Sequence, residues 1–137
     1  EKLWEEHCKE NLDATFYEHT VDGTNFEIMS MISLKSTYEN GENRHRSEHC
    51  SLYVRENLNN FAVKKITNPP KELIRMDLRL TVDNPEDLVV CRILFNEFKH
   101  LAPRIPVKEL IKFLDKNEHL KKLVYPFTEI GYSTMYR

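Results

Sequence analysis

The chain has 137 residues, of which 40% are hydrophobic and 31% are charged, and its formal net charge at pH 7 is −2. This length supports one sizeable core, and we expect residues 1–137 to form a single domain. The small negative charge argues against a general nucleic-acid binder, because such a surface needs clustered Lys and Arg. No apolar run approaches the roughly 20 residues that span a bilayer, so no membrane segment is expected.

The three cysteines are Cys8, Cys50 and Cys91, which are widely spaced and form no CxxC pair. An odd, scattered set is typical of a reducing compartment, and we therefore expect a cytoplasmic protein. The dipeptides His7-Cys8 and His49-Cys50 invite a zinc interpretation, but a four-ligand spacing is absent. No orienting acid marks Cys50 and His49 as a nucleophile pair either.

The first half of the chain predicts alternating helices and short strands. Helices are expected in three segments, namely residues 1–11, 30–39 and 47–57, and strands in three others, namely residues 14–20, 25–30 and 61–66. A turn at 21–23 separates the first two strands, a polar loop covers 39–46, and Ser47 is the expected N-cap of the third helix.

The second half contains the strongest predicted helix, residues 85–101. Pro85 suits its first position, Asn84 suits the N-cap, and two acids follow in the first turn. Its apolar residues lie on two sides, which predicts deep burial. Alternation over residues 76–82 predicts a strand before it, with one apolar face made of Met76, Leu78, Leu80 and Val82.

After this helix, residues 106–117 and 118–124 predict one or two short helices. We expect the last dozen residues to pack on the body or on a partner through aromatic side chains of this region, which are Tyr125, Phe127, Tyr132 and Tyr136. The order of elements is α-β-β-α-α-β-β-α-α, which indicates an α/β or α+β class.

Asp83, in the stretch RLTVDNPEDL (79–88), has two interpretations. It can simply open the following helix, as Asp before Asn-Pro-Glu-Asp often does. It can also bind a hard cation, because ligands bind at the carboxyl ends of strands in open α/β sheets, and Mg²⁺ prefers one or two carboxylates with phosphate and water. Asp77 is a weaker candidate for a second ligand.

The stretch RHRSEHC (44–50) also has two interpretations. It can be a solvated helix start, with Glu48 near the positive end of the helix dipole. It can instead be an anion-binding lip, because the guanidinium groups of Arg44 and Arg46 suit carboxylate or phosphate.

Three motifs in order change the balance between these interpretations: GTNFEIMS at 23–30, RSEHCSLYVREN at 46–57, and RLTVDNPEDL at 79–88. Together they resemble the C-terminal half of the SpsF-like cytidylyltransferases of spore coat polysaccharide biosynthesis, relatives of the CMP-sialic acid and CMP-Kdo synthetases. In that family the corresponding patterns are G-x-x-x-E-[VI]-x-S, S/R-E-H-V-x-x-Y-[IV] and R-L-T-V-D-T-P-E-D-L. The resemblance extends to about residue 100 and fades beyond it.

The resemblance implies the C-terminal part of a nucleotide-diphospho-sugar transferase fold, which is a Rossmann-like, GT-A-type, three-layer α/β/α arrangement. Asp83 matches the acid that family members place at the Mg²⁺ on the nucleotide phosphates, whereas Thr81 stands where sialic-acid relatives have a second acid. Four residues match segments that border the sugar pocket and form much of the dimer contact in the relatives, namely Glu27, Arg46, Glu48 and His49.

The activity implied is attack of a sugar or sugar acid on CTP with Mg²⁺ as cofactor, in a homodimer, without nucleic-acid or membrane partners. The family's Gly-rich nucleotide loop and its Asp-x-Pro segment have no counterpart in this chain. We therefore expect a fragment that is inactive alone. The alternative is a non-catalytic dimerisation or partner-binding module derived from the same fold, in which Asp83 is only a helix cap.

Overall fold

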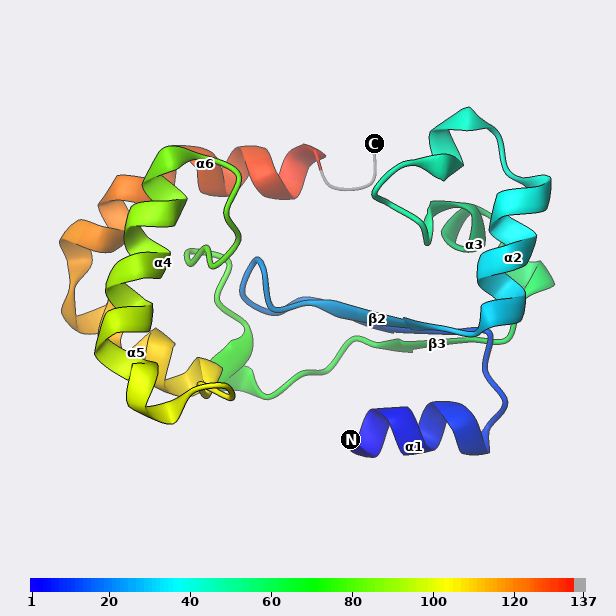
Figure 1. Ribbon diagram of the computed structural model, residues 1–137, viewed down its shortest axis with the longest axis horizontal. Coiled ribbons are helices and arrows are strands. Elements are labelled where there is room, and N and C mark those ends of the chain that lie inside the picture. The colour runs from blue at the N-terminus through cyan, green and yellow to red at the C-terminus, as the bar shows by residue number, and fades with distance from the viewer. Residues whose placement is uncertain (135–137) are drawn as a thin grey trace. The chain divides into compact units, whose positions relative to one another are not determined.

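Strand β1 (Ala14–Tyr17) is the central strand of a three-stranded sheet in the computed structural model, which describes residues 1–134 without the side chains of residues 129 and 131–134. It pairs antiparallel with β2 (Phe26–Met29) and parallel with β3 (Val63–Ile66). Both neighbouring strands are labelled in Figure 1. Ala14 and Phe16 are buried on one face, and Thr15 is buried on the other. A central strand buried on both faces is typical of mixed α/β folds.

The chain divides into two units. We call residues 1–18 and 26–67 the sheet unit, and residues 19–25 and 68–134 the helical unit. The single-domain assignment of residues 1–137 stays a prediction.

Three α-helices belong to the sheet unit: α1 (Lys2–Lys9), α2 (Met31–Asn40) and α3 (Leu52–Glu56). Short 3₁₀ turns occupy Asn43–Arg46 and Leu58–Asn60. Val54 of α3 packs with Ala14 and Phe16 in a small apolar core. Ser30 caps α2 by accepting a hydrogen bond from the Ser33 amide at 3.0 Å, so the start predicted for this helix is confirmed.

The helix predicted over 47–57 is shorter than expected, because α3 begins at Leu52. The Ser47 hydroxyl accepts a hydrogen bond from the His49 amide at 3.3 Å, so Ser47 forms a local turn and not an N-cap. Serine side chains compete with helix formation in this way. The loop predicted over 39–46 contains a 3₁₀ turn, in which the His45 Nδ1 accepts a hydrogen bond from the Glu42 amide at 2.8 Å.

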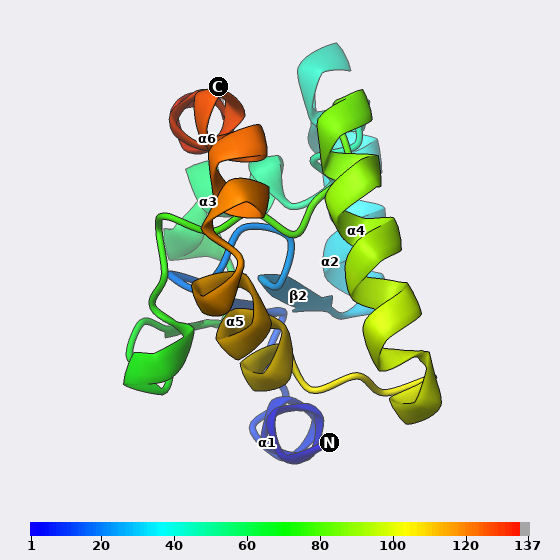
Figure 2. The same cartoon turned by 90° about the vertical axis from the view of Figure 1, so that its left-hand side faces the viewer.

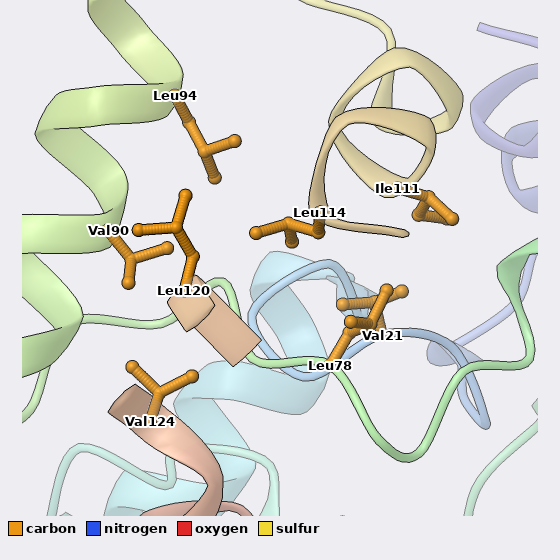
Figure 3. Packing of buried hydrophobic residues seen from close by; sticks show 8 residues of the cluster. All are labelled: Val21, Leu78, Val90, Leu94, Ile111, Leu114, Leu120 and Val124. Carbon is orange, nitrogen blue, oxygen red and sulfur yellow. The ribbon is translucent and has the colours of Figure 1, made fainter. Parts of the chain in front are cut away.

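The helical unit contains α4 (Pro85–Phe98), α5 (Val107–Lys116) and α6 (Glu118–Thr134), with 3₁₀ turns at Lys71–Leu73 and Lys99–Leu101. Helix α6 packs against both α4 and α5, and the three helices are labelled in Figure 2. Figure 3 shows the apolar cluster to which these helices contribute together with two residues from loop segments, Val21 and Leu78. The helix residues of the cluster are Val90, Leu94, Ile111, Leu114, Leu120 and Val124.

The predicted start of α4 is confirmed, since Asn84 and Asp87 form a capping box and Pro85 is the first helical residue. The prediction of burial on two sides is wrong within the described residues. Among the apolar residues of this helix, only Val90 and Leu94 are buried. Other apolar side chains of the helix are between 38% and 54% exposed, namely Leu88, Val89, Ile93 and Phe95.

The strand predicted over 76–82 is also wrong. The structure has only an isolated parallel bridge between Asp22 and Arg79 in this segment. Leu78 is buried, but Met76 and Val82 are 48% and 50% exposed, so the alternating residues do not form one buried face. The buried neighbour of Leu78 is Arg79, at 4% exposure, because the interior of this unit supplies carboxylate partners for its guanidinium.

The segment after residue 117 forms one 17-residue helix, α6, where the sequence predicts only a short one. Of the aromatic residues named in that prediction, Tyr125 is 62% exposed and Phe127 is half-buried. Tyr132 and Tyr136 lie outside the residues whose side chains are described. Across the described part of the chain, none of the helices has both the length and the apolar character needed to cross a bilayer.

Candidate functional site

The guanidinium of Arg79 is a buried cation of the helical unit, and the side chain of this residue is 3% exposed. Its Nε donates to Asp87 Oδ1 at 2.9 Å, and its Nη1 donates to Asp22 Oδ2 at 2.8 Å. Its Nη2 donates to Asp83 Oδ2 at 2.5 Å. One cation therefore faces three carboxylates, and this corner carries a formal excess of negative charge.

Asp83 is the exposed member of this group. Its side chain is 65% exposed, whereas those of Asp22 and Asp87 are 6% and 0% exposed. The Asp83 amide donates to Asp87 Oδ2 at 3.0 Å, and the Thr81 hydroxyl lies 3.4 Å from Asp83 Oδ2. The prediction that Asp83 lies at the corner before a helix is confirmed, but Asn84, not Asp83, is the N-cap residue.

Asp22 and Asp87 share Arg79, yet their pKa values move in opposite directions. Burial raises the pKa of Asp22, the charge of Asp83 raises it further, and Arg79 only partly compensates. Burial also opposes ionisation of Asp87, but the hydrogen bonds from Arg79 and from the backbone amides of Asp83 and Asn84 outweigh it and lower the pKa of Asp87. Asp87 is therefore the principal anionic partner of Arg79.

This difference predicts the order in which the two carboxylates titrate. We expect Asp87 to protonate below the ordinary value for Asp, about 3.9, and Asp22 above it. The stabilisation from ionised Asp87 is present above about pH 4 and is lost as the pH falls through its lowered pKa, whereas the cost of ionising Asp22 disappears in acid. Carboxyl-carbon NMR titration of the two side chains tests this, and the reverse order of midpoints contradicts it.

In the sheet unit, Glu27 lies beside a cation that the sequence analysis did not select. Arg55 donates from Nη2 to Glu27 Oε1 at 2.6 Å and from Nη1 to Glu18 Oε1. Its guanidinium also lies 3.8 Å from the centroid of the Phe16 ring, and its Nε donates to Ser51 Oγ at 3.2 Å. These contacts fix the Glu27 carboxylate at one edge of the sheet.

The other three residues predicted to border a sugar pocket lie in the segment before α3. Arg46 is exposed and donates from Nη2 to the Tyr38 carbonyl at 3.1 Å, with its guanidinium 5.1 Å from the Tyr38 ring centroid. Glu48 is exposed and His49 is half-buried. Arg44, the other cation of the predicted anion-binding lip, forms two hydrogen bonds with Glu56, at 2.5 and 2.7 Å. Its guanidinium is therefore engaged within the chain.

Asp77, the weaker candidate for a second ligand, belongs to a different ion-pair network. Arg75 donates to Asp77 at 2.8 and 2.7 Å and to Asp115 of α5 at 2.8 and 2.7 Å. The hydrogen bonds from Arg75 lower the pKa of Asp77. The structure therefore pairs Asp77 with Arg75 and Asp83 with Arg79.

The fit of Mg²⁺ to this corner depends on Asp83. Within the described residues, no group of three or more His, Cys, Asp or Glu side chains is placed to hold a metal ion. Mg²⁺ does not require such a group, because it is commonly held by one or two carboxylates with phosphate and water. An exposed carboxylate in an electronegative corner fits the single-ligand version of this site, and Thr81 does not supply a second acid.

Sequence reasoning missed Asp22, Arg79 and Arg55 as partners of the candidate residues. Arg79 and Arg55 lie within the motifs at 79–88 and 46–57, but neither was selected as a site residue. Asp22 lies 57 residues from Arg79, so only the fold brings the two together. An Asp-Gly turn that follows a strand was the available signal, since such turns allow close backbone approach.

Comparison with known proteins bears on the fold. The structure of a cytidylyltransferase from Leptospira borgpetersenii serovar Hardjo-bovis matches with a TM-score of 0.67 and 20% sequence identity, over 87% of this chain and 52% of that one. The chain therefore has a cytidylyltransferase-like fold, and the α/β class is confirmed. An uncharacterized protein of Methanocaldococcus jannaschii is 29% identical over 115 residues, which are 84% of this chain and 46% of that protein. No protein-family model matches.

The chain spans about half the length of both of these proteins.

Proposed function

We propose that this chain forms the C-terminal half of a cytoplasmic, SpsF-like cytidylyltransferase that activates a sugar, preferably a sugar acid, with CTP for surface or spore-coat polysaccharide. The cytidylyltransferase-like fold supports this proposal, as does the share of the neighbouring structure that the chain covers. The main observation is the corner before α4, where the motif RLTVDNPEDL presents one exposed carboxylate, Asp83, above a buried ion-pair network.

In the proposed reaction, the sugar hydroxyl oxygen bonds to the α-phosphorus of CTP, the bond to the bridging oxygen breaks, and pyrophosphate leaves. The hydroxyl proton passes to water or a base. Asp83 would hold Mg²⁺, which when bound neutralises charge on the phosphates. Arg55 orients Glu27 at the proposed sugar pocket through their 2.6 Å hydrogen bond, while Arg46, Glu48 and His49 would border that pocket. Positioning accounts for much of the rate in such transfers.

Replacement of Asp83 by Asn in the full-length protein that carries this chain tests the proposal. We expect pyrophosphate release from CTP, measured with Mg²⁺ and a panel of sugar acids, to fall at least about 100-fold, because electrostatic stabilisation of that order is lost when such a group is removed. Glu86→Gln is the matched control. It removes one negative charge from the first turn of the same helix, and we expect it to retain activity.

Two outcomes contradict this proposal. The first is a folded full-length protein that releases no pyrophosphate from CTP with any sugar acid of the panel. The second is an Asp83→Asn variant as active as the Glu86→Gln control, which leaves Asp83 without a role in the reaction.

A second candidate function is a non-catalytic dimerisation module, and one observation favours it. Helix α2 exposes three large apolar or aromatic side chains, since Met31, Ile32 and Tyr38 are 77%, 80% and 68% exposed. Exposed apolar patches often mark protein–protein contacts. A homodimer is compatible with both functions, so sedimentation analysis alone does not separate them. The module hypothesis requires, in addition, that Asp83→Asn leave every function of the protein unchanged.

A further inference from the structure

The buried guanidinium of Arg79 has three carboxylate partners, and the two buried ones are enough to compensate its charge. Asp87 and Asp22, both nearly inaccessible, already place two negative charges on it at 2.9 and 2.8 Å. The additional hydrogen bond, from Nη2 to Asp83 Oδ2, reaches out to a carboxylate that is 65% exposed. Water can hydrate such a carboxylate, so an exposed pair of this kind adds little to stability. Its main consequence is therefore for Asp83 itself.

Asp83 is held through both its backbone and its side chain. Its amide donates to Asp87 Oδ2 at 3.0 Å, and its carboxylate accepts from Arg79. Asp87 also accepts a hydrogen bond from Arg79 Nε. The buried Asp87 carboxylate therefore fixes both the backbone of Asp83 and the Arg79 guanidinium that contacts the Asp83 side chain. The planar guanidinium offers its donors in a rigid fork, which sets the orientation of each partner.

The hydrogen bonds that the structure gives the Asp83 carboxylate fall on Oδ2, within the described residues. We propose that Arg79 is a positioning residue that fixes the Asp83 carboxylate for binding of a divalent cation. This inference rests on the proposed function, in which Asp83 is the cation ligand. A ligand held in one orientation loses less conformational freedom when the cation binds. Partners that orient metal ligands typically change metal affinity by about 10–100-fold.

Mn²⁺ binding to the full-length protein, measured by electron paramagnetic resonance with a non-hydrolysable CTP analogue that supplies the phosphate oxygens, tests this inference independently of activity. Arg79→Lys keeps the buried positive charge for Asp22 and Asp87 but removes the fork that also reaches Asp83. We expect it to weaken Mn²⁺ binding at least about tenfold. Arg75→Lys is the matched control, because Arg75 bridges two carboxylates of the same unit without contacting Asp83, and it should bind Mn²⁺ as the wild type does.

A double-mutant cycle shows whether Arg79 acts through Asp83. If it does, Arg79→Lys causes no further loss of Mn²⁺ affinity once Asp83 is Asn. An Arg79→Lys variant that melts cooperatively and binds Mn²⁺ as tightly as the wild type overturns the positioning role. Equal Mn²⁺ affinity of the wild type and Asp83→Asn instead overturns the cation assignment of the proposed function.

Arg79→Lys can also fail to fold, so a crystal structure of the wild-type protein with Mn²⁺ gives an independent answer. A cation on the Asp83 carboxylate, with Asp83 Oδ2 still within hydrogen-bond distance of Arg79 Nη2, supports the proposal. A cation that binds Asp83 only after the side chain has turned away from Arg79 overturns it.

Discussion

Replacement of Arg79 by Met is expected to lower the free energy of unfolding by about 3–5 kcal/mol, the cost of removing one partner from a buried ion pair. The side chain of Arg79 is 3% exposed, and its partners Asp22 and Asp87 are 6% and 0% exposed. Met fills a similar volume but offers no donor. The two carboxylates must then be protonated, become hydrated or remain unpaired, and each of these alternatives costs stability.

Arg75→Met is the control for this comparison, because Arg75 also bridges carboxylates, namely Asp77 and Asp115. Its side chain is 25% exposed, and its partners Asp77 and Asp115 are 50% and 42% exposed. Ion pairs at this exposure contribute at most about 1 kcal/mol. Urea unfolding followed by circular dichroism gives both values. Equal losses for the two variants contradict the view that burial makes the Arg79 network essential.

Local signals in the sequence predicted the parts of the fold that depend on neighbouring residues. Pro85 and its N-cap Asn84 determine the start of α4 through contacts within one helical turn, and the structure confirms that start. The same holds for Ser30 and α2, where the cap bonds an amide three residues away. Such features depend on short-range chemistry, which is visible in a single sequence.

The strand predicted over 76–82 failed because its alternation does not reflect burial. Burial in this segment is determined by contacts distant in sequence: Arg79 is held inside by Asp22, and Leu78 packs in a cluster with side chains of α4, α5 and α6. The candidate site likewise combines a residue that a local motif predicts with one that only the fold brings near. Asp83 was predicted from its motif, but Asp22 lies too far away in sequence for any local pattern to connect it with Arg79.

The approach of Asp22 to Arg79 depends on Gly23, and we expect Gly23→Ala to lower the free energy of unfolding by about 2–5 kcal/mol. Gly23 has φ +86°, a left-handed conformation that costs other residues about 1–2 kcal/mol. A Cβ atom at this position would lie 2.5 Å from the Thr81 nitrogen and 2.6 Å from the Leu80 carbonyl carbon. Both atoms belong to the backbone, so the clash cannot be relieved by a side-chain rotation.

Gly23→Asn separates the two causes of this loss. Asn adopts left-handed conformations more readily than Ala, but it has the same Cβ atom. If the close approach dominates, Asn recovers little of the stability that Ala loses. If backbone conformation dominates, Asn recovers most of the stability that Ala loses, and the importance of the close approach is contradicted.

Displacement of this turn by Gly23→Ala is also expected to lengthen the 2.8 Å hydrogen bond from the Leu80 amide to the Asp22 carbonyl. Since that bond joins the backbone of Asp22 to the segment that carries Arg79, Gly23→Ala should also disturb the contacts that orient Asp83.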